Sequence, residues 1–221
     1  MTIKPILFNT EMVRAILDGR KTCTRRIVKP QQLMGMLPDK CKKGAPEEFL
    51  KEKKLMFKPY CDMTDIELIN TAYKAPYQPG DILYVRETWH KYAKLVGKGE
   101  GCHLEEFYGY KASIANSEDA EEPWKPSIHM PKEAARIWLK VTDVRVERLQ
   151  DITDDGAKAE GANWKNGKNV GWEEKMRRTA IERFAEIWDS TIKKSDRDRY
   201  GWVANPWVWV IEFERCEKPK E

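Results

Sequence analysis

The N-terminal segment combines helical and strand-like patterns of apolar residues. A helical stripe is formed by Met12, Val13, Ile16 and Leu17. Asn9 or Thr10 can cap this helix, and Gly19 can end it. Residues 22–28 then alternate in the manner of a strand, with Thr22, Thr24 and Arg26 on one side and Cys23, Arg25 and Ile27 on the other. Neither side is uniformly apolar, so we expect one of them to line a polar cavity.

Further strands and helices follow toward the C-terminus. Strand patterns cover residues 82–87, 135–149 and 207–213. Helical patterns cover residues 153–160, which Thr153 can cap, and residues 173–191. In the longest strand the apolar phase changes between Val141 and Val144, which predicts a bulge near Thr142 and Asp143.

Two segments interrupt this series. Prolines break every periodic stretch of residues 30–79, and residues 93–128 contain several glycines and an acidic run, with one strand expected over 107–111. We expect both to be irregular insertions in a single domain that spans residues 1–221. The order of elements shows no alternation of strands and helices, so it predicts an α+β fold, a small mixed β-barrel with helices at its ends.

Composition narrows the class of protein. A hydrophobic fraction of 41%, with nine Trp, eight Tyr and six Phe, is sufficient for a folded core despite a mean hydropathy of −0.73. Apolar runs are shorter than the roughly 20 residues of a membrane helix, and the N-terminus does not resemble a secretory signal. The five cysteines form no short CxxC pair. We therefore expect a cytoplasmic protein that contacts no membrane and holds neither metal nor cofactor.

The net charge of +4 is unevenly distributed. Residues 1–60 contain 14 Lys and Arg against 6 Asp and Glu, an excess of +8, and the remainder carries −4. The cations around Lys21 have Asp18 as their one nearby opposing charge. Such a field attracts phosphate, although a solvated basic surface without a ligand has the same composition.

Two motifs within these segments resemble a known family. They are Gly19-Arg20-Lys21-Thr22-Cys23-Thr24-Arg25-Arg26 and the segment Gly80–Trp89, and they are similar to the ASCH domain. Residues 149–161 and 201–209 resemble the longer phage and prophage branch of the family. The resemblance does not extend to residues 30–78 or 93–128. It implies a PUA-like β-barrel that is associated with RNA and modified nucleosides.

The resemblance also implies a site. Small bacterial members hydrolyse N4-acetylcytidine with a lysine, a threonine and a glutamate, whose positions correspond here to Lys21, Thr24 and Glu160. Other members are ribonucleases that act on single strands, or have no assigned activity. For contacts to nucleic acid we predict Arg20, Arg25, Arg26, Arg86 and Trp89, the last by base stacking.

The residues allow two assignments of the chemistry. Lys21 is a base for Thr24 only in its neutral form, which neighbouring arginines and burial favour. A close Glu160 would instead keep the lysine charged, so that Lys21 binds a carbonyl oxygen or phosphate and Glu160 activates water. The sequence does not choose between the two.

The sequence thus predicts a domain that binds RNA, single-stranded nucleic acid or a modified nucleoside, with amidohydrolase or ribonuclease activity as an open question. A binding module without catalysis is one alternative. A phage-associated module that captures a protein through its insertions is another. The substrate, the oligomeric state and the role of the insertions are not fixed by the sequence.

Overall fold

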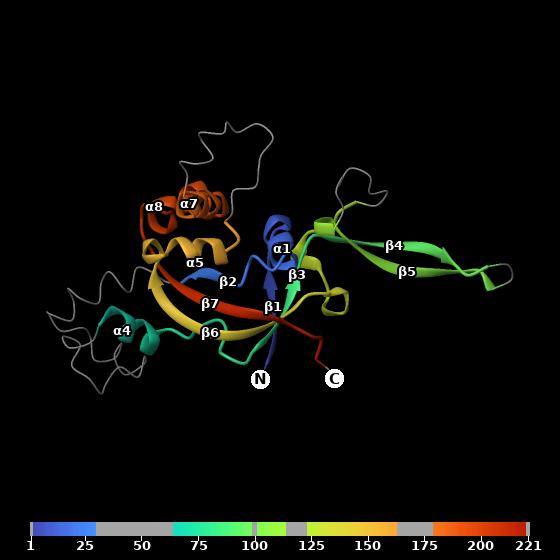
Figure 1. The fold of residues 1–221 in the computed structure, drawn as a ribbon, viewed down its shortest axis with the longest axis horizontal. Helices are drawn as coiled ribbons and strands as arrows, with labels where there is room; N and C mark the ends of the chain where they lie inside the picture. The colour runs from blue at the N-terminus through green and yellow to red at the C-terminus, as the bar shows by residue number, and fades with distance from the viewer. Residues whose placement is uncertain (1, 30–63, 99–100, 114–122, 163–178, 220–221) are drawn as a thin grey trace. The chain divides into compact units, whose positions relative to one another are not determined.

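The computed structural model describes residues 2–29, 64–98, 101–113, 123–162 and 179–219 (Figure 1). The described strands are β1 (Ile3–Leu7), β2 (Cys23–Ile27), β3 (Ile82–Arg86), β4 (Trp89–Val96), β5 (His103–Tyr110), β6 (Trp138–Arg148) and β7 (Trp207–Cys216). The described α-helices are α1 (Thr10–Leu17), α4 (Asp65–Ala72), α5 (Asp154–Ala159), α7 (Ala180–Thr191) and α8 (Arg197–Tyr200). None of the helices within these ranges is long and apolar enough to cross a membrane.

Five strands form a mixed sheet in the order β1-β3-β6-β7-β2, and β4 and β5 form a separate hairpin. β1 is parallel to β3, whereas the β3–β6 and β2–β7 pairs are antiparallel. The α+β class is therefore confirmed. The expected closure into a barrel is not seen among the described strands, whose pairing order is open at both ends.

The chain divides into two compact units, although β6 and β7 run through both. Unit 1 comprises residues 1–22, 80–141 and 213–221, and unit 2 comprises residues 23–79 and 142–212. In unit 1, Asp81 fastens β1 by accepting hydrogen bonds from the Thr2 hydroxyl (2.6 Å) and the Lys4 ammonium (2.7 Å). Its core includes Ile82, Trp89, Met130, Ala134, Ala135 and Trp138.

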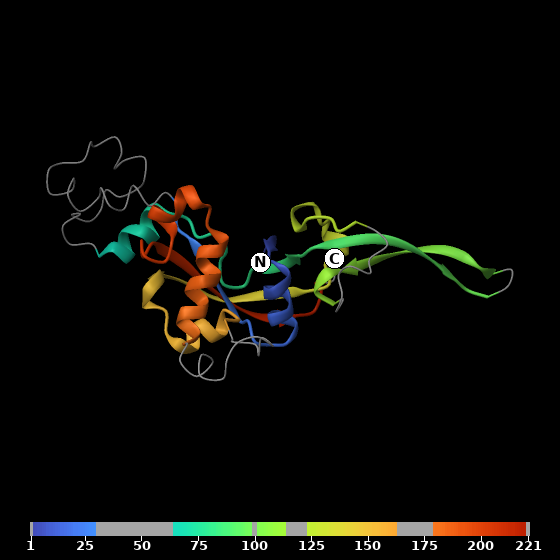
Figure 2. The same ribbon diagram turned by 90° about the horizontal axis from the view of Figure 1, so that it is seen from above.

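Unit 2 has a helical layer over its part of the sheet. Threonine hydroxyls cap both principal helices, because Thr153 accepts from the Gly156 N–H (3.0 Å) and Thr179 from the Glu182 N–H (3.2 Å). The buried core between helices and strands includes Leu149, Ile152, Ala157, Phe184, Trp188, Val208 and Val210. α5 and α7 therefore cover the side of the sheet to which Ile27 of β2 contributes (Figure 2).

The prediction of an irregular segment over residues 93–128 is wrong for its first part. β4 and β5 pair over eight positions, from Trp89 with Tyr110 to Val96 with His103. Cross-strand pairs explain this hairpin, since Tyr92 stacks on Phe107 with ring centroids 5.8 Å apart and Lys91 forms an ion pair with Glu106. The predicted strand over 107–111 is part of this longer ribbon.

The other insertion is described only in its last part, where Thr64 and Glu67 form a capping box at the start of α4. The first six residues of the helix predicted over 173–191, residues 173–178, lie outside the described ranges.

Candidate functional site

β2 presents its polar residues on two sides, as the alternation predicts. It pairs with β7 so that Thr24 lies opposite Ile211 and Arg25 opposite Val210. Nη1 of Arg25 is 3.9 Å from Sγ of Cys23, which places these two side chains on the same side of the strand. Both are buried, as is Thr24. The predicted strand is therefore confirmed, and three of its polar side chains are buried. The polar cavity expected beside it stays a prediction.

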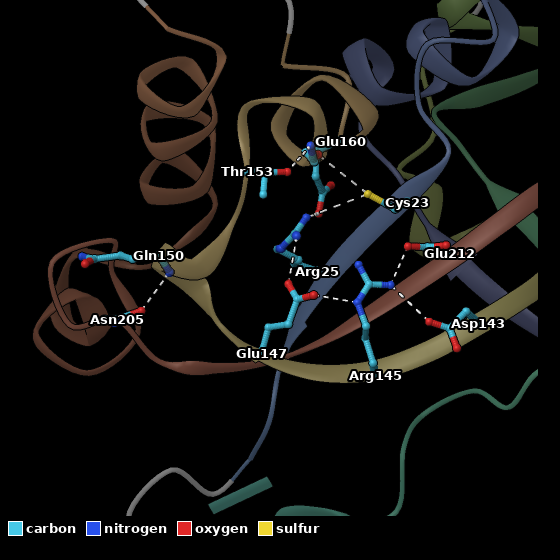
Figure 3. A network of polar contacts seen from close by, with 11 residues as sticks. Cys23, Arg25, Asp143, Arg145, Glu147, Gln150, Thr153, Glu160, Asn205 and Glu212 are labelled. Atoms are coloured by element: carbon cyan, nitrogen blue, oxygen red, sulfur yellow. Dashed lines mark hydrogen bonds and ion pairs between the residues drawn. The ribbon is translucent and has the colours of Figure 1, made fainter.

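The guanidinium of Arg25 is divided between two carboxylates. Nη2 donates to Oε2 of Glu147 at 3.1 Å, and Nη1 lies 3.5 Å from Oε1 of Glu160 (Figure 3). The ring of Phe184 from α7 lies 5.9 Å from the guanidinium carbon. Nε of Arg25 is buried and has no hydrogen-bond partner among the described residues. Arg25 was predicted to contact nucleic acid, but its side chain lies inside unit 2, between the sheet and the helices.

Glu160 is brought to Arg25 by the geometry of α5. It is the C-cap residue of this helix, and its backbone N–H donates to the carbonyl of Gly156 at 3.0 Å. A Cβ at Gly156 would lie 3.2 Å from Oγ1 of Thr153 and 3.3 Å from Cγ1 of Ile152, so a glycine suits the close packing at the start of this helix. The thiol of Cys23 also donates to the Gly156 carbonyl, at 3.9 Å.

The polar network extends from Glu147 toward solvent (Figure 3). Nε of Arg145 donates to Glu147 at 2.6 Å, and its Nη1 contacts Asp143 and Glu212. Burial opposes the charge of Arg145, but the hydrogen bonds that it donates to Glu212 and Glu147 outweigh burial and raise its pKa. This exposed arginine holds Glu147 in place on the outer side of Arg25.

Arg26, on the other side of β2, is half-buried. Burial lowers its pKa, and the charges of Tyr77 and Glu160 oppose that change. Burial raises the pKa of the Tyr77 phenol, which Arg26 partly offsets. Tyr77 is a residue of this region that the sequence did not suggest, because it lies in the proline-rich insertion without any periodic pattern around it.

Unit 1 contains the remaining predicted residues of the first motif. Lys21 is buried, and its Nζ lies 5.4 Å from the centroid of the Phe8 ring. Arg20 donates to Asp18 at 2.8 Å, so its charge is locally balanced.

Arg86 and Trp89 are also in unit 1. Nη2 of Arg86 donates to the carbonyl of Ile128. Trp89 is buried, its ring 5.7 Å from that of Tyr108 and 5.2 Å from Nζ of Lys125. In this arrangement Trp89 packs in the core of unit 1 rather than presenting a free face for a base.

In unit 2, Glu160 is therefore paired with Arg25 on one side of β2, and its charge also acts on Arg26. Thr24, which alternation places on the same side of the strand as Arg26, is buried. Within the described ranges, no group of three or more His, Cys, Asp or Glu side chains is arranged to hold a metal ion. The chain matches no protein-family model, no curated protein and no solved structure.

Proposed function

We propose that the chain is an ASCH-type domain, with a fold related to the PUA barrel, that binds RNA or a modified nucleoside and hydrolyses an acylated cytidine. The proposal rests on the motif from Gly19 to Arg26 and on the later Glu160. It assigns the reaction to Lys21, Thr24 and Glu160. The ligand class is the one that the family resemblance implies, and the basic N-terminal segment suits a phosphate-bearing ligand.

One observation carries the proposal: unit 2 buries polar groups of the motif where an apolar core would be the simpler solution. Thr24, Arg25 and Glu160 are 3%, 6% and 5% exposed. Charged side chains are rarely buried unless they are paired, and clusters of them are common at functional sites. One carboxylate, that of Glu147, would be enough to pair with the charge of Arg25. The second carboxylate at the same guanidinium, that of Glu160, is not needed for this pairing.

The contact between Arg25 and Glu160 favours one of the two chemical assignments. The guanidinium of Arg25, 3.5 Å away, holds the Glu160 carboxylate in place, and in this assignment that carboxylate accepts the proton. In the proposed reaction, water adds to the acetyl carbon of N4-acetylcytidine and gives a proton to Glu160. That proton passes to N4 as the C–N bond breaks, which yields acetate and cytidine. Lys21 and Thr24 bind the carbonyl oxygen and orient the amide.

The arginines of the motif have different roles in this proposal. Arg25 holds Glu160, because its two terminal nitrogens are engaged by the carboxylates of Glu147 and Glu160. Arg26 is assigned to a phosphate or base, since it lies on the other side of β2 from Arg25 and is partly exposed. Arg20 is already paired with Asp18, so it contributes less.

The test measures turnover and binding separately. The purified chain is incubated with N4-acetylcytidine and with single-stranded RNA, and products are detected by mass spectrometry. We expect cytidine release by the wild type, and a loss of at least about 100-fold in Glu160→Gln, Lys21→Met and Thr24→Val. Asp155→Asn, an exposed acidic residue of the same helix, is the matched control and should retain full turnover.

Binding is measured by titrating RNA at several salt concentrations. We expect Arg26→Gln to weaken RNA binding and to reduce its salt dependence. Binding without any product would replace the hydrolase by a non-catalytic reader. Turnover that is equal in the wild type and in Glu160→Gln would reject the site.

A further inference from the structure

The distal half of the β4–β5 hairpin exposes an apolar pair. Leu95 and Leu104 lie directly opposite each other across the two strands, and they are 63% and 69% exposed. This end of the hairpin extends away from the other described elements of unit 1 (Figures 1 and 2). Single exposed leucines are common on protein surfaces, but adjacent ones form a patch that typically marks an interaction site.

The pair belongs to a defined side of the ribbon. Residues that lie directly opposite each other in an antiparallel pair share a face, and alternate residues along each strand do the same. Lys91, Ala93 and Leu95 of β4 are therefore on the same face as Leu104 and Glu106 of β5. The ion pair between Lys91 and Glu106 agrees with this placement. We refer to these five residues as the leucine face.

The two strands carry opposite charges. On the leucine face β4 contributes Lys91 and β5 contributes Glu106, whereas Lys94 and Glu105, which pair with each other in register, lie on the opposite face. This balance gives a polyanion such as RNA no net attraction to the leucine face. It does make the leucine face complementary to a second copy of itself, because the Lys91 side of one copy can lie over the Glu106 side of the other.

We propose that the leucine face is a docking surface for the same face of a second copy of the chain. A two-fold axis along the hairpin places β4 of each copy over β5 of the other. Leu95 then packs on Leu104 of the second copy, and Lys91 comes within reach of Glu106 of the second copy. Each contact occurs twice, as the symmetry of such an interface requires. This inference concerns unit 1 and does not depend on the proposed reaction.

The size of the surface determines the strength of the association. Eight residues of strand span about 27 Å, and a two-stranded ribbon offers one narrow face. The area that such a narrow face can bury is therefore well below that of a standard protein–protein interface, about 1,600 Å². The dimer therefore forms and dissociates reversibly, and its fraction rises with protein concentration.

Sedimentation velocity of the full chain over a range of concentrations tests the docking. The wild type should shift from monomer toward dimer, and Leu95→Asp with Leu104→Asp should raise the dissociation constant by at least about tenfold. The matched control is Ile128→Asp with Val203→Asp, which introduces the same two charges at apolar positions that are 59% and 89% exposed. This control should dimerise like the wild type.

Charge reversal tests the two-fold arrangement itself. Lys91→Glu and Glu106→Lys should each weaken the dimer when studied alone, because each places like charges together. An equal mixture of the two variants should dimerise again, since both intermolecular ion pairs are restored in the mixed dimer. If Lys91 and Glu106 acted only in folding, mixing the two variants would not restore dimerisation. A chain that stays monomeric at all concentrations, a mixture that does not recover, or association that requires RNA would overturn the proposal.

Discussion

Each unit of the molecule buries a glutamate beside an arginine, and the two pairs differ in geometry. In unit 1, Glu87 is 1% exposed and accepts two hydrogen bonds from Arg136, from Nε at 2.8 Å and from Nη2 at 2.9 Å. In unit 2, Glu160 has one contact with Arg25, at 3.5 Å, and shares that arginine with Glu147. The bidentate pair is typical of a structural anchor. In the pair of unit 2, Arg25 is instead divided between two carboxylates.

The surroundings of the two arginines reinforce this difference. Arg136 also donates to the Ser113 hydroxyl at 2.6 Å, and its guanidinium lies 4.1 Å from the centre of the Tyr110 ring. Its contacts therefore hold it in one place. Arg25, in contrast, has a buried Nε without a hydrogen-bond partner among the described residues. Unit 1 thus shows what a buried ion pair looks like when stability is its role.

The largest effect should follow from breaking the anchor of unit 1. Arg136→Met leaves Glu87 buried without its cation, and we expect the free energy of unfolding to fall by about 3–5 kcal/mol. Urea denaturation of the wild type and the variant measures this difference in the free energy of unfolding. Lys140→Met is the control, because its pair with Glu214 is exposed, and it should change the stability by less than about 0.5 kcal/mol. If Arg136→Met costs no more than this control, Glu87 is not an anchor.

A smaller effect should distinguish the two glutamates. Glu87→Gln weakens two charged hydrogen bonds and should cost about 2–3 kcal/mol, whereas Glu160→Gln weakens a longer contact with Arg25 and should cost less, about 1 kcal/mol. Both variants keep the side-chain volume, so the comparison isolates the charge. Equal losses in urea denaturation would mean that the two carboxylates serve the same structural purpose.

The smallest effect concerns a tyrosine in each unit. Burial raises the pKa of Tyr77 in unit 2 and of Tyr110 in unit 1, and Arg26 and Arg136 respectively oppose the shift. A raised pKa in the folded state means that stability is fully present below the ordinary value of about 10 and is lost as the pH rises through the folded pKa.

The wild type should therefore lose more stability on alkaline titration than Tyr77→Phe or Tyr110→Phe. The absorbance of the phenolate reports the same groups, and each variant should lack one late-titrating tyrosine. Identical titration curves for wild type and variants would contradict the assigned burial.

Local patterns were sufficient to predict much of unit 2. The side chain of Thr153 caps the helix that ends at Glu160, and the alternation along β2 places Cys23 and Arg25 together, both as expected. Val141 and Val146 of β6 are both buried although they lie five residues apart, which agrees with the predicted change of phase. These features depend on residues that are close in sequence, so the order of amino acids along the chain is enough to predict them.

Features that depend on distant partners could not be predicted in this way. Glu147 reaches Arg25 across 122 residues, and no spacing rule connects them. β1 was not expected because Pro5 interrupts it, yet the strand lies at the edge of the sheet, where a proline is tolerated. The hairpin of β4 and β5 was missed because its distal residues are exposed on both faces and show no apolar alternation.

The most direct test of the account is the turnover of N4-acetylcytidine by the wild type, Glu160→Gln and Asp155→Asn under identical conditions. The account predicts release of cytidine and acetate by the wild type and Asp155→Asn, and a loss of at least about 100-fold in Glu160→Gln with only a small change in stability. Release by Glu160→Gln at the rate of the wild type, or none by any of the three, would contradict it.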